Sequence, residues 1–408
     1  MFVGTGHVPK LKSVSCVDGI VHRCSAFIGM APRLSHLEGE PPRMIPISCR
    51  AALYKIPCRR ILENSTERFA EYEYIVVKIS FDDGTEGTGW TYTQGKGGTS
   101  VLHLINDYFA KEVTAKEVSD PVGLYNLLWA ATYSYGLEGP ARLAYGALDV
   151  ALWDANAKAV ELPLYVMLGA SKKKKVKAYR SAIDLNYTEE ELVADCLRFK
   201  GQGFTAFKIK VGKSDFREDL RRIETVRNAV GPGSILMVDA NRKWTLKEAA
   251  RKGKEFERLG LSWLEEPIEA NLLDDYRHLS RKLGIPIAAG ESLYNRSEAV
   301  ALVAGKCVDV VQLDVLRVGG ITEWIKLAHM AELLGLPMAP HFSEEIAVQV
   351  LCSIRNGIYL EHLPGSNLHD SGMLKNSFIL RDGYAIPPER PGHGIEFDLD
   401  KLAQFESK

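Results

Sequence analysis

The chain of 408 residues lacks several features that would point to particular classes of protein. No apolar stretch approaches the roughly 18 residues of an ordinary membrane span. The formal net charge is −1, so no excess of basic charge is available to attract nucleic acid or an acidic membrane. The N-terminus also lacks the ordered charged region, apolar region and cleavage site of a secretory signal. We therefore expect a cytoplasmic protein with neither a nucleic-acid partner nor a membrane partner.

Paired cysteines are also missing. The seven cysteines include no CxxC pair and no zinc-ligand spacing, and their odd number and scatter predict free thiols. The remaining composition, with 46% hydrophobic and 25% charged residues, is ordinary for a globular protein. At this length the chain can form two domains, or one large domain with a cap, around a sizeable core.

The hydrophobic pattern divides the chain into four parts. Residues 1–44 carry few periodic signals and several Gly and Pro, and we interpret them as an N-terminal extension. Its role stays open between a flexible segment, an oligomer contact and a segment outside the native product. Residues 45–168 contain alternating strands around a DDG turn and then the helical pattern ARLAYGALDVALWDANAKAVEL, which predicts an α+β capping domain.

Residues 169–365 show a different rhythm, in which short apolar strands alternate with helical segments. Eight such strands are recognisable: VKAYRSA, AFKIKVG, ILMVDAN, SWLEEP, IPIAAGES, VDVVQLD, PMAPHF and IYLEHLP. This repetition predicts an α/β fold, a modified (β/α)8 (TIM-like) barrel. Residues 366–408 are expected to return to the capping domain.

Polar residues end the last six of these strands, where a barrel places its chemistry. They are Asp239 and Asn241, Glu265 and Glu266, Glu291, Asp314, His341 and Glu361. Asp239, Glu265 and Glu291 follow one another at intervals of 26 residues, so adjacent strands deliver them to one mouth. Such carboxylates repel one another unless a cation lies between them, and an all-oxygen site suits Mg²⁺. The alternative is that each one caps a helix or pairs with an arginine.

The strand AFKIKVG contains two lysines, Lys208 and Lys210. Side chains two positions apart on a strand share a face, so both ammonium groups enter the same space, where they repel one another and lose hydration. The lysines could instead belong to an edge strand or extend to water at a strand end.

From residue 45 to the C-terminus, the sequence resembles the enolase superfamily and, within it, the mandelate racemase subgroup. The resemblance rests on ALDVALWDANAK, on the strand motifs KIK, VDAN, EEP and GES, on the pair Asp314 and His341, and on Glu361. It implies that Asp239, Glu265 and Glu291 bind Mg²⁺. The preference for Glu265 over Glu266 comes from the resemblance alone.

The resemblance also assigns acid–base roles. Lys210 would remove the proton α to a substrate carboxylate, with Lys208 helping to hold its pKa below the ordinary lysine value of about 10.4. His341, oriented and made more basic by Asp314, would lie opposite Lys210 across the substrate. A protonated Glu361 would donate a hydrogen bond to the enediolate intermediate.

Contacts to the rest of the substrate are expected from Asn241 and from two polar cap segments, CRRILENSTERFAEYE and YTQGKGG. Asn241 would contact the α-hydroxyl. The candidates in the cap are Arg59, Arg60, Tyr92 and Lys96, and the alternative is that these segments are ordinary exposed loops.

The reaction implied by the resemblance is dehydration of a sugar acid to a 2-keto-3-deoxy acid by a homo-oligomeric enzyme. The substrate would be of the hexarate or aldonate type, with galactarate or talarate as examples, because polar cap loops suit hydroxyls or a distal carboxylate. One alternative is racemisation or epimerisation of a 2-hydroxy acid. A more remote one is a non-catalytic scaffold or binding protein, since fold does not imply function.

Overall fold

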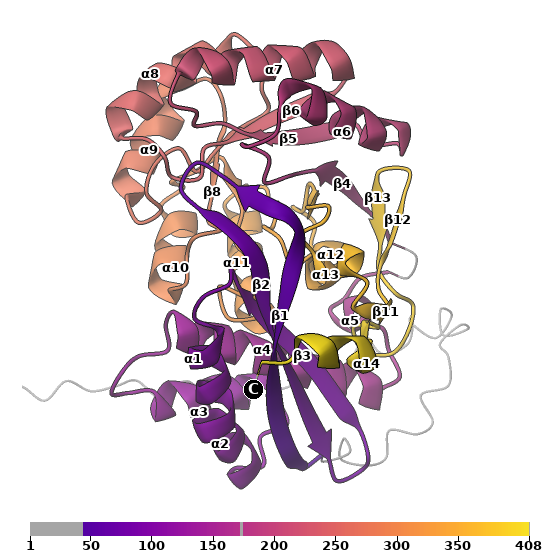
Figure 1. Ribbon diagram of the computed structural model, residues 1–408. Helices are drawn as coiled ribbons and strands as arrows, with labels where there is room; N and C mark the ends of the chain where they lie inside the picture. The colour runs from indigo at the N-terminus through magenta and orange to yellow at the C-terminus, as the bar shows by residue number, and fades with distance from the viewer. Residues whose placement is uncertain (1–43, 172–173, 408) are drawn as a thin grey trace, which may run out of the picture. The chain divides into compact units, whose positions relative to one another are not determined.

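A computed structural model of the protein describes residues 44–171 and 174–407 (Figure 1). The N-terminal extension expected at residues 1–44 lies outside this range except for its last residue. From Met44 onward the chain forms one compact unit. No helix in the described ranges is long and apolar enough to cross a membrane.

The first part of the unit is an antiparallel sheet followed by helices. Its strands, in sheet order, are β1 (Pro46–Glu63), β2 (Arg68–Phe81) and β3 (Glu86–Thr93). The DDG turn joins β2 to β3, and Gly84 adopts a φ of 86° there, a conformation that favours glycine. The helices are α1 (Gly98–His103), the π-helix η1 (Leu104–Phe109), α2 (Ala110–Ala115), α3 (Pro121–Ala131), α4 (Pro140–Ala159) and α5 (Leu164–Met167).

Helix α4 is the centre of this domain, and most of its side chains are buried. It lies against β3 so closely that two glycines are required on the strand. A Cβ added to Gly89 would lie 2.0 Å from the carbonyl oxygen of Ala147, and one added to Gly87 would lie 2.1 Å from that of Ala151. On its other side α4 reaches the barrel, where Asp149 accepts hydrogen bonds from the backbone N–H and the hydroxyl of Thr322.

The second part is a barrel of parallel strands. The strands are β4 (Val176–Arg180), β5 (Ala206–Lys210), β6 (Ile235–Asp239), β7 (Leu264–Glu265), β8 (Ile287–Ala289), β9 (Val310–Val311) and β10 (Leu360–His362). From β4 to β9 each strand pairs with the next in parallel, and β10 returns to pair with β4. The predicted seventh strand, PMAPHF, is reduced to Met338, which forms bridges to Val311 and Gly357 and so closes the ring.

Helices cover the barrel (Figure 1). They are α6 (Glu189–Gly201), α7 (Phe216–Val230), α8 (Leu246–Glu257), α9 (Leu273–Lys282), α10 (Arg296–Ala304), α11 (Ile321–Leu333) and α12 (Glu344–Ser353). Thr188 and Thr245 begin α6 and α8 with reciprocal capping boxes. The TIM-like barrel predicted from the sequence is confirmed, with two differences. The seventh strand is reduced to a bridge residue, and the first helix after β10 is the four-residue α13 (Leu368–Ser371), so in the described chain the eighth strand–helix unit has no full helix.

The C-terminal segment replaces that helix and runs back to the first domain. Its elements are β11 (Leu374–Asn376), β12 (Ile379–Arg381), β13 (Tyr384–Ile386), β14 (Glu396–Phe397), α14 (Leu399–Leu402) and the 3-10 helix η2 (Ala403–Phe405). Strand β13 pairs antiparallel with β4. Near the end, Glu406 bridges to Tyr54 of β1, and the N–H of Ser407 donates to the carbonyl of Leu53.

The close approach of β3 and α4 leads to a prediction about stability. Gly89→Ala should destabilise the protein by about 1–3 kcal/mol, the usual cost of overpacking, because the new Cβ must push α4 away. The matched control is Gly201→Ala at the end of α6, whose Cβ would enter open space. Thermal unfolding followed by circular dichroism should show a lower Tm for Gly89→Ala alone. Equal Tm values for the two variants would contradict this account of the packing.

Candidate metal and acid–base site

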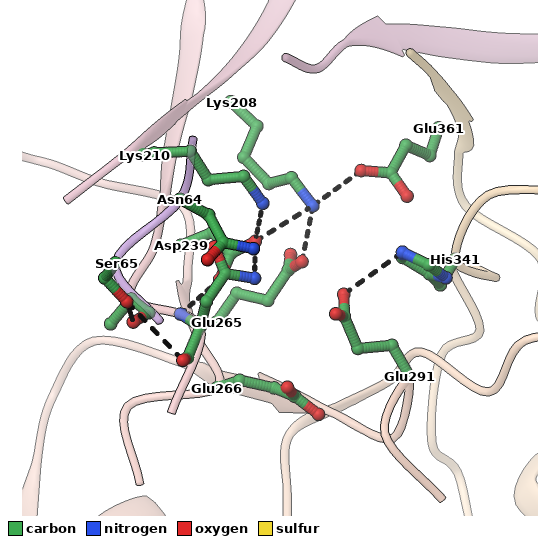
Figure 2. Close-up of polar contacts among 12 residues, drawn as sticks. Asn64, Ser65, Lys208, Lys210, Asp239, Glu265, Glu266, Glu291, His341 and Glu361 are labelled. Atoms are coloured by element: carbon green, nitrogen blue, oxygen red, sulfur yellow. Dashed lines mark hydrogen bonds and ion pairs between the residues drawn. The ribbon is translucent and has the colours of Figure 1, made fainter. Parts of the chain in front are cut away.

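Three carboxylates from neighbouring strands converge at the mouth of the barrel (Figure 2). Asp239 ends β6, Glu265 ends β7 in register with it, and Glu291 follows the end of β8. All three are buried, and each offers one oxygen within 4.8 Å of the others. The barrel register therefore brings together the residues that the 26-residue spacing singled out.

Glu265, and not its neighbour Glu266, belongs to this cluster. Successive residues of a strand point in opposite directions, and one carboxylate oxygen of Glu265 accepts hydrogen bonds from Trp263 Nε1 at 3.0 Å and from Gln312 Nε2 at 2.6 Å. Glu266 accepts instead from the Ser292 hydroxyl at 2.8 Å, and burial raises its pKa to about 8. The structure thus places Glu265 in the cluster and Glu266 outside it; that Glu265 binds the metal stays a prediction.

Lys208 and Lys210 point into the same cluster (Figure 2). The ammonium group of Lys208 contacts Glu265, lies 2.7 Å from Glu361 and lies 3.8 Å from Asp239. The ammonium group of Lys210 contacts Asp239. Each lysine is therefore held by at least one carboxylate of the cluster, and neither belongs to an edge strand.

The expected lowering of the Lys210 pKa is not found in this structure. Burial, the largest single effect, and the charge of Lys208 both lower the pKa of Lys210, as expected, but Asp239 together with Glu291 and Glu265 outweighs them and the pKa is raised. The pKa of Lys208 is also raised, because Glu265 and Glu361 outweigh the effect of its burial. The sequence showed the two like charges but not the carboxylate directly beside each of them.

The chemistry of the cluster fits a hard divalent cation. Its donors are carboxylate oxygens from Asp239, Glu265 and Glu291, with no sulfur or nitrogen, and such a set suits Mg²⁺. The two ammonium groups drawn into the cluster show how strongly it attracts positive charge. That a metal ion binds here stays a prediction of the carboxylate geometry.

His341 and Asp314 form a hydrogen-bonded pair beside the cluster. Nδ1 of His341 lies 2.9 Å from Oδ2 of Asp314, and Nε2 lies 3.5 Å from Oε2 of Glu291. The other oxygen of Asp314 accepts the N–H groups of Leu316 and Arg317 at 2.8 and 3.1 Å. Asp314 is thus fixed by the backbone, and it turns the free nitrogen of His341 towards the carboxylates.

Tyr92 lines the cavities at the barrel mouth, where it was expected to contact substrate, and it also contacts the His341–Asp314 pair. Its hydroxyl comes from β3 of the capping domain and donates to Oδ2 of Asp314 at 2.7 Å, the same oxygen that His341 contacts. Although burial raises the pKa of Asp314, the hydrogen bond and charge of His341, with Arg317 and Tyr92, hold it below its ordinary value. Tyr92 therefore supports the His341–Asp314 pair from the cap.

Glu361 also differs from the expectation, because the structure surrounds it with donors. Its oxygens accept from the N–H of Phe342 at 2.9 Å and from Lys208. Burial raises its pKa, but Lys208, His341 and Lys210 outweigh burial and hold the pKa well below the usual range. Glu361 is thus an ionised acceptor here, whereas the resemblance implied a protonated donor.

Asn241 lies at the edge of the cluster in a strained backbone conformation. Its φ is 43°, and Phe342, which follows His341, has a φ of 44°. Such values are uncommon for residues other than glycine and concentrate at functional sites. The side-chain N–H of Asn241 donates to Asp239, while its buried Oδ1 has no partner among the described residues. This oxygen is free to accept a hydrogen bond from a ligand hydroxyl.

Two cavities lie at the mouth. The catalytic cavity is lined by Asn64, Tyr72, Tyr92, Gln94, Ile183, Lys210, Asn241, Glu291, His341, Phe342, Glu361 and Leu363. The outer cavity, of about 430 Å³, shares Tyr92 and Gln94 with it and also contains Arg68, Lys96 and Arg317. Lys96 therefore lies next to the site, and its contact with substrate stays a prediction.

Arg59 and Arg60 are not brought to either cavity. Both line a different one, where Arg59 donates to the carbonyl of Asp370 and Arg60 lies 4.1 Å over the ring of Tyr187. The physical reason is that β1 continues to Glu63, so the turn above the catalytic cavity begins at Asn64 and not at the arginines.

The sequence interpretation missed several residues of the site. Asn64 and Gln94 lie within the two predicted cap segments but were not singled out. Gln312 is two positions before Asp314, and its side-chain N–H binds Glu265. Because residues two apart on a strand share a face, a polar Gln312 in this apolar strand indicated a second side chain pointing into the site with Asp314. Arg317, whose guanidinium donates to the carbonyl of Glu291 at 3.0 Å, lies beyond any strand pattern.

Two family models match the chain. The model for the N-terminal domain of mandelate racemase and muconate lactonizing enzyme matches residues 55–169. The model described as enolase C-terminal domain-like matches residues 191–401. The first match begins within β1 and covers the rest of the sheet and its helices up to α5, and the second covers most of the barrel and much of the segment after it.

Individual relatives match over most of their length. The 3,6-anhydro-alpha-L-galactonate cycloisomerase of Streptomyces coelicolor is 31% identical over 357 residues, which cover 87% of this chain and 98% of that protein. The L-talarate/galactarate dehydratase of Salmonella typhimurium is 32% identical over 347 residues, or 85% of each chain. A crystal structure described as a racemase from Streptomyces coelicolor with bound magnesium has a TM-score of 0.84 at 30% identity, covering 88% of this chain and 99% of that one.

The carboxylate cluster predicts a binding result that does not depend on turnover. Glu291→Gln should weaken Mg²⁺ binding by more than about 10-fold. Losing a residue that only supports a metal ligand already weakens binding by about 10-fold or more, and losing a ligand should cost at least as much. Glu266→Gln is the matched control, because this neighbouring carboxylate is buried outside the cluster. Isothermal titration calorimetry of metal-free protein measures both. Equal affinities for the two variants, with both folded, would remove Glu291 from the metal site.

Proposed function

This chain belongs to the mandelate racemase and muconate lactonizing enzyme family of the enolase superfamily, and from that premise we propose that it is a Mg²⁺-dependent enzyme that removes the proton α to the carboxylate of a sugar acid. The observation that carries the proposal is the arrangement of the catalytic cavity. Lys210 and His341, two groups able to move protons, line it together with the metal-ligand candidate Glu291.

The residues that would hold the metal are Asp239, Glu265 and Glu291. When bound there, Mg²⁺ supplies electrophilic stabilisation of the negative charge that develops on the substrate carboxylate. The proton itself is handled by the protein. Lys210 takes the α-proton in its neutral form, and it reaches that form more easily when Asp239 shares its negative charge with a cation instead of with the ammonium group.

His341 acts on the other side of the reacting carbon. Asp314 binds Nδ1 and leaves Nε2 to face the cavity, so a protonated His341 can give its Nε2 proton to a departing β-hydroxyl. Loss of water from the enediolate then yields the enol of a 2-keto-3-deoxy acid. Asn241 accepts a hydrogen bond from a substrate hydroxyl through its free Oδ1.

A sugar acid of the hexarate or aldonate type suits the adjoining space. The outer cavity presents Lys96 and Arg68 together with the amide of Gln94 and the hydroxyls of Thr66 and Thr93. Such a wall suits a chain of hydroxyls or a second carboxylate better than an aromatic ring. The names of two relatives, a dehydratase of talarate and galactarate and a cycloisomerase of an anhydrogalactonate, agree with acid sugars.

Racemisation or epimerisation of a 2-hydroxy acid is the second candidate. It is favoured by the same pair of acid–base groups, because a proton taken by Lys210 could be replaced from His341 on the opposite face. The similar crystal structure described as a racemase supports keeping this candidate. The two reactions share proton abstraction and differ in whether the β-hydroxyl leaves.

The two-base arrangement predicts how proton exchange divides between the residues. In D₂O with Mg²⁺, Lys210→Ala and His341→Asn should each lose at least one exchange or elimination step. NMR of the substrate measures the exchange of its α-proton for deuterium. Lys96→Met, which alters the outer cavity alone, is the control and should mainly raise KM. Wild-type exchange rates in both of the first two variants would exclude the assignment.

The reaction itself is tested by a library of sugar acids with semicarbazide detection of keto products. We expect at least one hexarate or aldonate to give a 2-keto-3-deoxy acid, and excess EDTA to abolish its formation. Racemisation of a simple 2-hydroxy acid without any keto product would select the second candidate. Full activity in EDTA would contradict the metal assignment. A protein that binds Mg²⁺ but exchanges no α-proton would favour a non-catalytic role.

A further inference from the structure

Strand β5, which carries Lys208 and Lys210, is paired with β4 only up to Phe207, the residue before the first lysine. Strand β4 ends at Arg180, and its pairing with β5 in the described chain is confined to Arg180 and Phe207. In a parallel ladder the carbonyl of one residue and the N–H of the residue two positions on face the same neighbouring strand. The carbonyl of Lys208 and the N–H of Lys210 form such a pair around Ile209. Both would be left unpaired on the β4 side, at a cost in free energy because they are buried.

Two buried side chains take the place of the missing strand. Nη1 of Arg180 donates to the carbonyl of Lys208 at 3.1 Å, and the N–H of Lys210 donates to Oδ1 of Asp184 at 2.9 Å. The same Nη1 also donates to Oδ2 of Asp184 at 3.0 Å. Arg180 and Asp184 are both 0% exposed. Together they supply the donor and the acceptor that a strand residue opposite Ile209 would have supplied.

Asp184 is in turn fixed from two directions. Nη2 of Arg222, on α7, donates to its backbone carbonyl at 3.0 Å. The neighbouring Leu185 N–H donates at 3.0 Å to the carbonyl of Glu63, the last residue of β1. Glu63 directly precedes Asn64, which lines the catalytic cavity. The bond between Asp184 and Lys210 therefore joins the backbone of Lys210 to the cap strand that leads into this cavity.

We propose that Asp184, held by Arg180, is a positioning residue that fixes the backbone of Lys210, and so determines where the Lys210 ammonium group lies in the barrel mouth. This inference rests on the proposed role of Lys210 as the base. A small backbone shift at Lys210 displaces its ammonium group relative to Asp239 and the substrate, and a misplacement of about 1 Å can reduce a rate by about 100-fold. Among the described residues, the Asp184 side chain is bonded or paired with Arg180, Lys210 and Arg222 and not with Asp239, Glu265 or Glu291, so it would act through the backbone of Lys210.

The competing explanation is that Asp184 only stabilises a buried ion network. Asp195 provides the comparison, because among the described residues its carboxylate is paired with Arg180 and Arg198 and forms no hydrogen bond to β5. Its carboxylate accepts from Nε of Arg180 at 2.8 Å. A purely structural network predicts similar consequences from removing either carboxylate, namely a lower Tm with kcat retained.

The test compares Asp184→Asn with Asp184→Leu in the full-length protein, with Asp195→Asn as control. Asn and Leu have similar shapes and both remove the charge, but only Asn keeps an oxygen that can accept the Lys210 N–H. With the acid found to be turned over, we expect Asp184→Leu to lower kcat by about 10- to 100-fold, with KM and Mg²⁺ affinity unchanged. Asp184→Asn should recover most of that loss, and Asp195→Asn should keep kcat while lowering Tm. Asp184→Ala replaces the leucine variant if the latter does not fold.

Amide hydrogen exchange in the peptide that contains Lys210 gives a second readout that needs no substrate. Exchange should be faster in Asp184→Leu than in Asp184→Asn or Asp195→Asn. Equal kcat in the leucine and asparagine variants, or equal exchange in all three, would overturn the inference. If the wild-type protein turned over no acid at all, the proposed function would fail, while the exchange comparison would still decide whether Asp184 holds the Lys210 N–H.

Discussion

Mutual repulsion among three buried carboxylates is the constraint on which the rest of this structure depends. Asp239, Glu265 and Glu291 could not be ionised together in a dry barrel mouth without positive charge among them. In the structure the ammonium groups of Lys208 and Lys210 provide part of that charge. Among the described residues, the same three carboxylates also form the group that could hold a divalent cation. The same arrangement of charges would hold the lysine base and bind the metal, and the bound metal would stabilise the negative charge of the enediolate.

The fold supplies the rigidity that such an arrangement requires. The carboxylates lie at the ends of adjacent parallel strands, and the capping domain contributes Asn64, Tyr92 and Gln94 to the same mouth. Tyr92 is instructive, because it connects the cap to Asp314 and so to His341. Chemistry in the barrel is thus tied to the position of the cap. The glycines of β3 matter for the same reason, since they let α4 and its sheet lie close against each other.

Much of this could be predicted from the sequence, because strand and helix periods and a regular spacing of charges are local signals. The barrel and the convergence of the carboxylates follow from such signals, whereas the pairing of His341 with Asp314 was implied by the family resemblance. What the sequence could not provide was long-range geometry and its electrostatics. The length of β1 kept Arg59 away from the cavity. Contacts with Asp239 and Lys208 help to shift the pKa values of Lys210 and Glu361 in the directions opposite to those expected. Asp184 carried no recognisable signal at all, since its role arises where a neighbouring strand ends.

The most direct test of the central claim is a crystal structure of the protein grown with Mn²⁺ in place of Mg²⁺ and a 2-hydroxy acid, with the metal located by anomalous diffraction. The account predicts one strong anomalous peak coordinated by Asp239, Glu265 and Glu291, with the ammonium group of Lys210 turned from Asp239 towards the α-carbon of the acid. A peak bound elsewhere, or a cluster still closed by the two lysines at saturating metal, would contradict it.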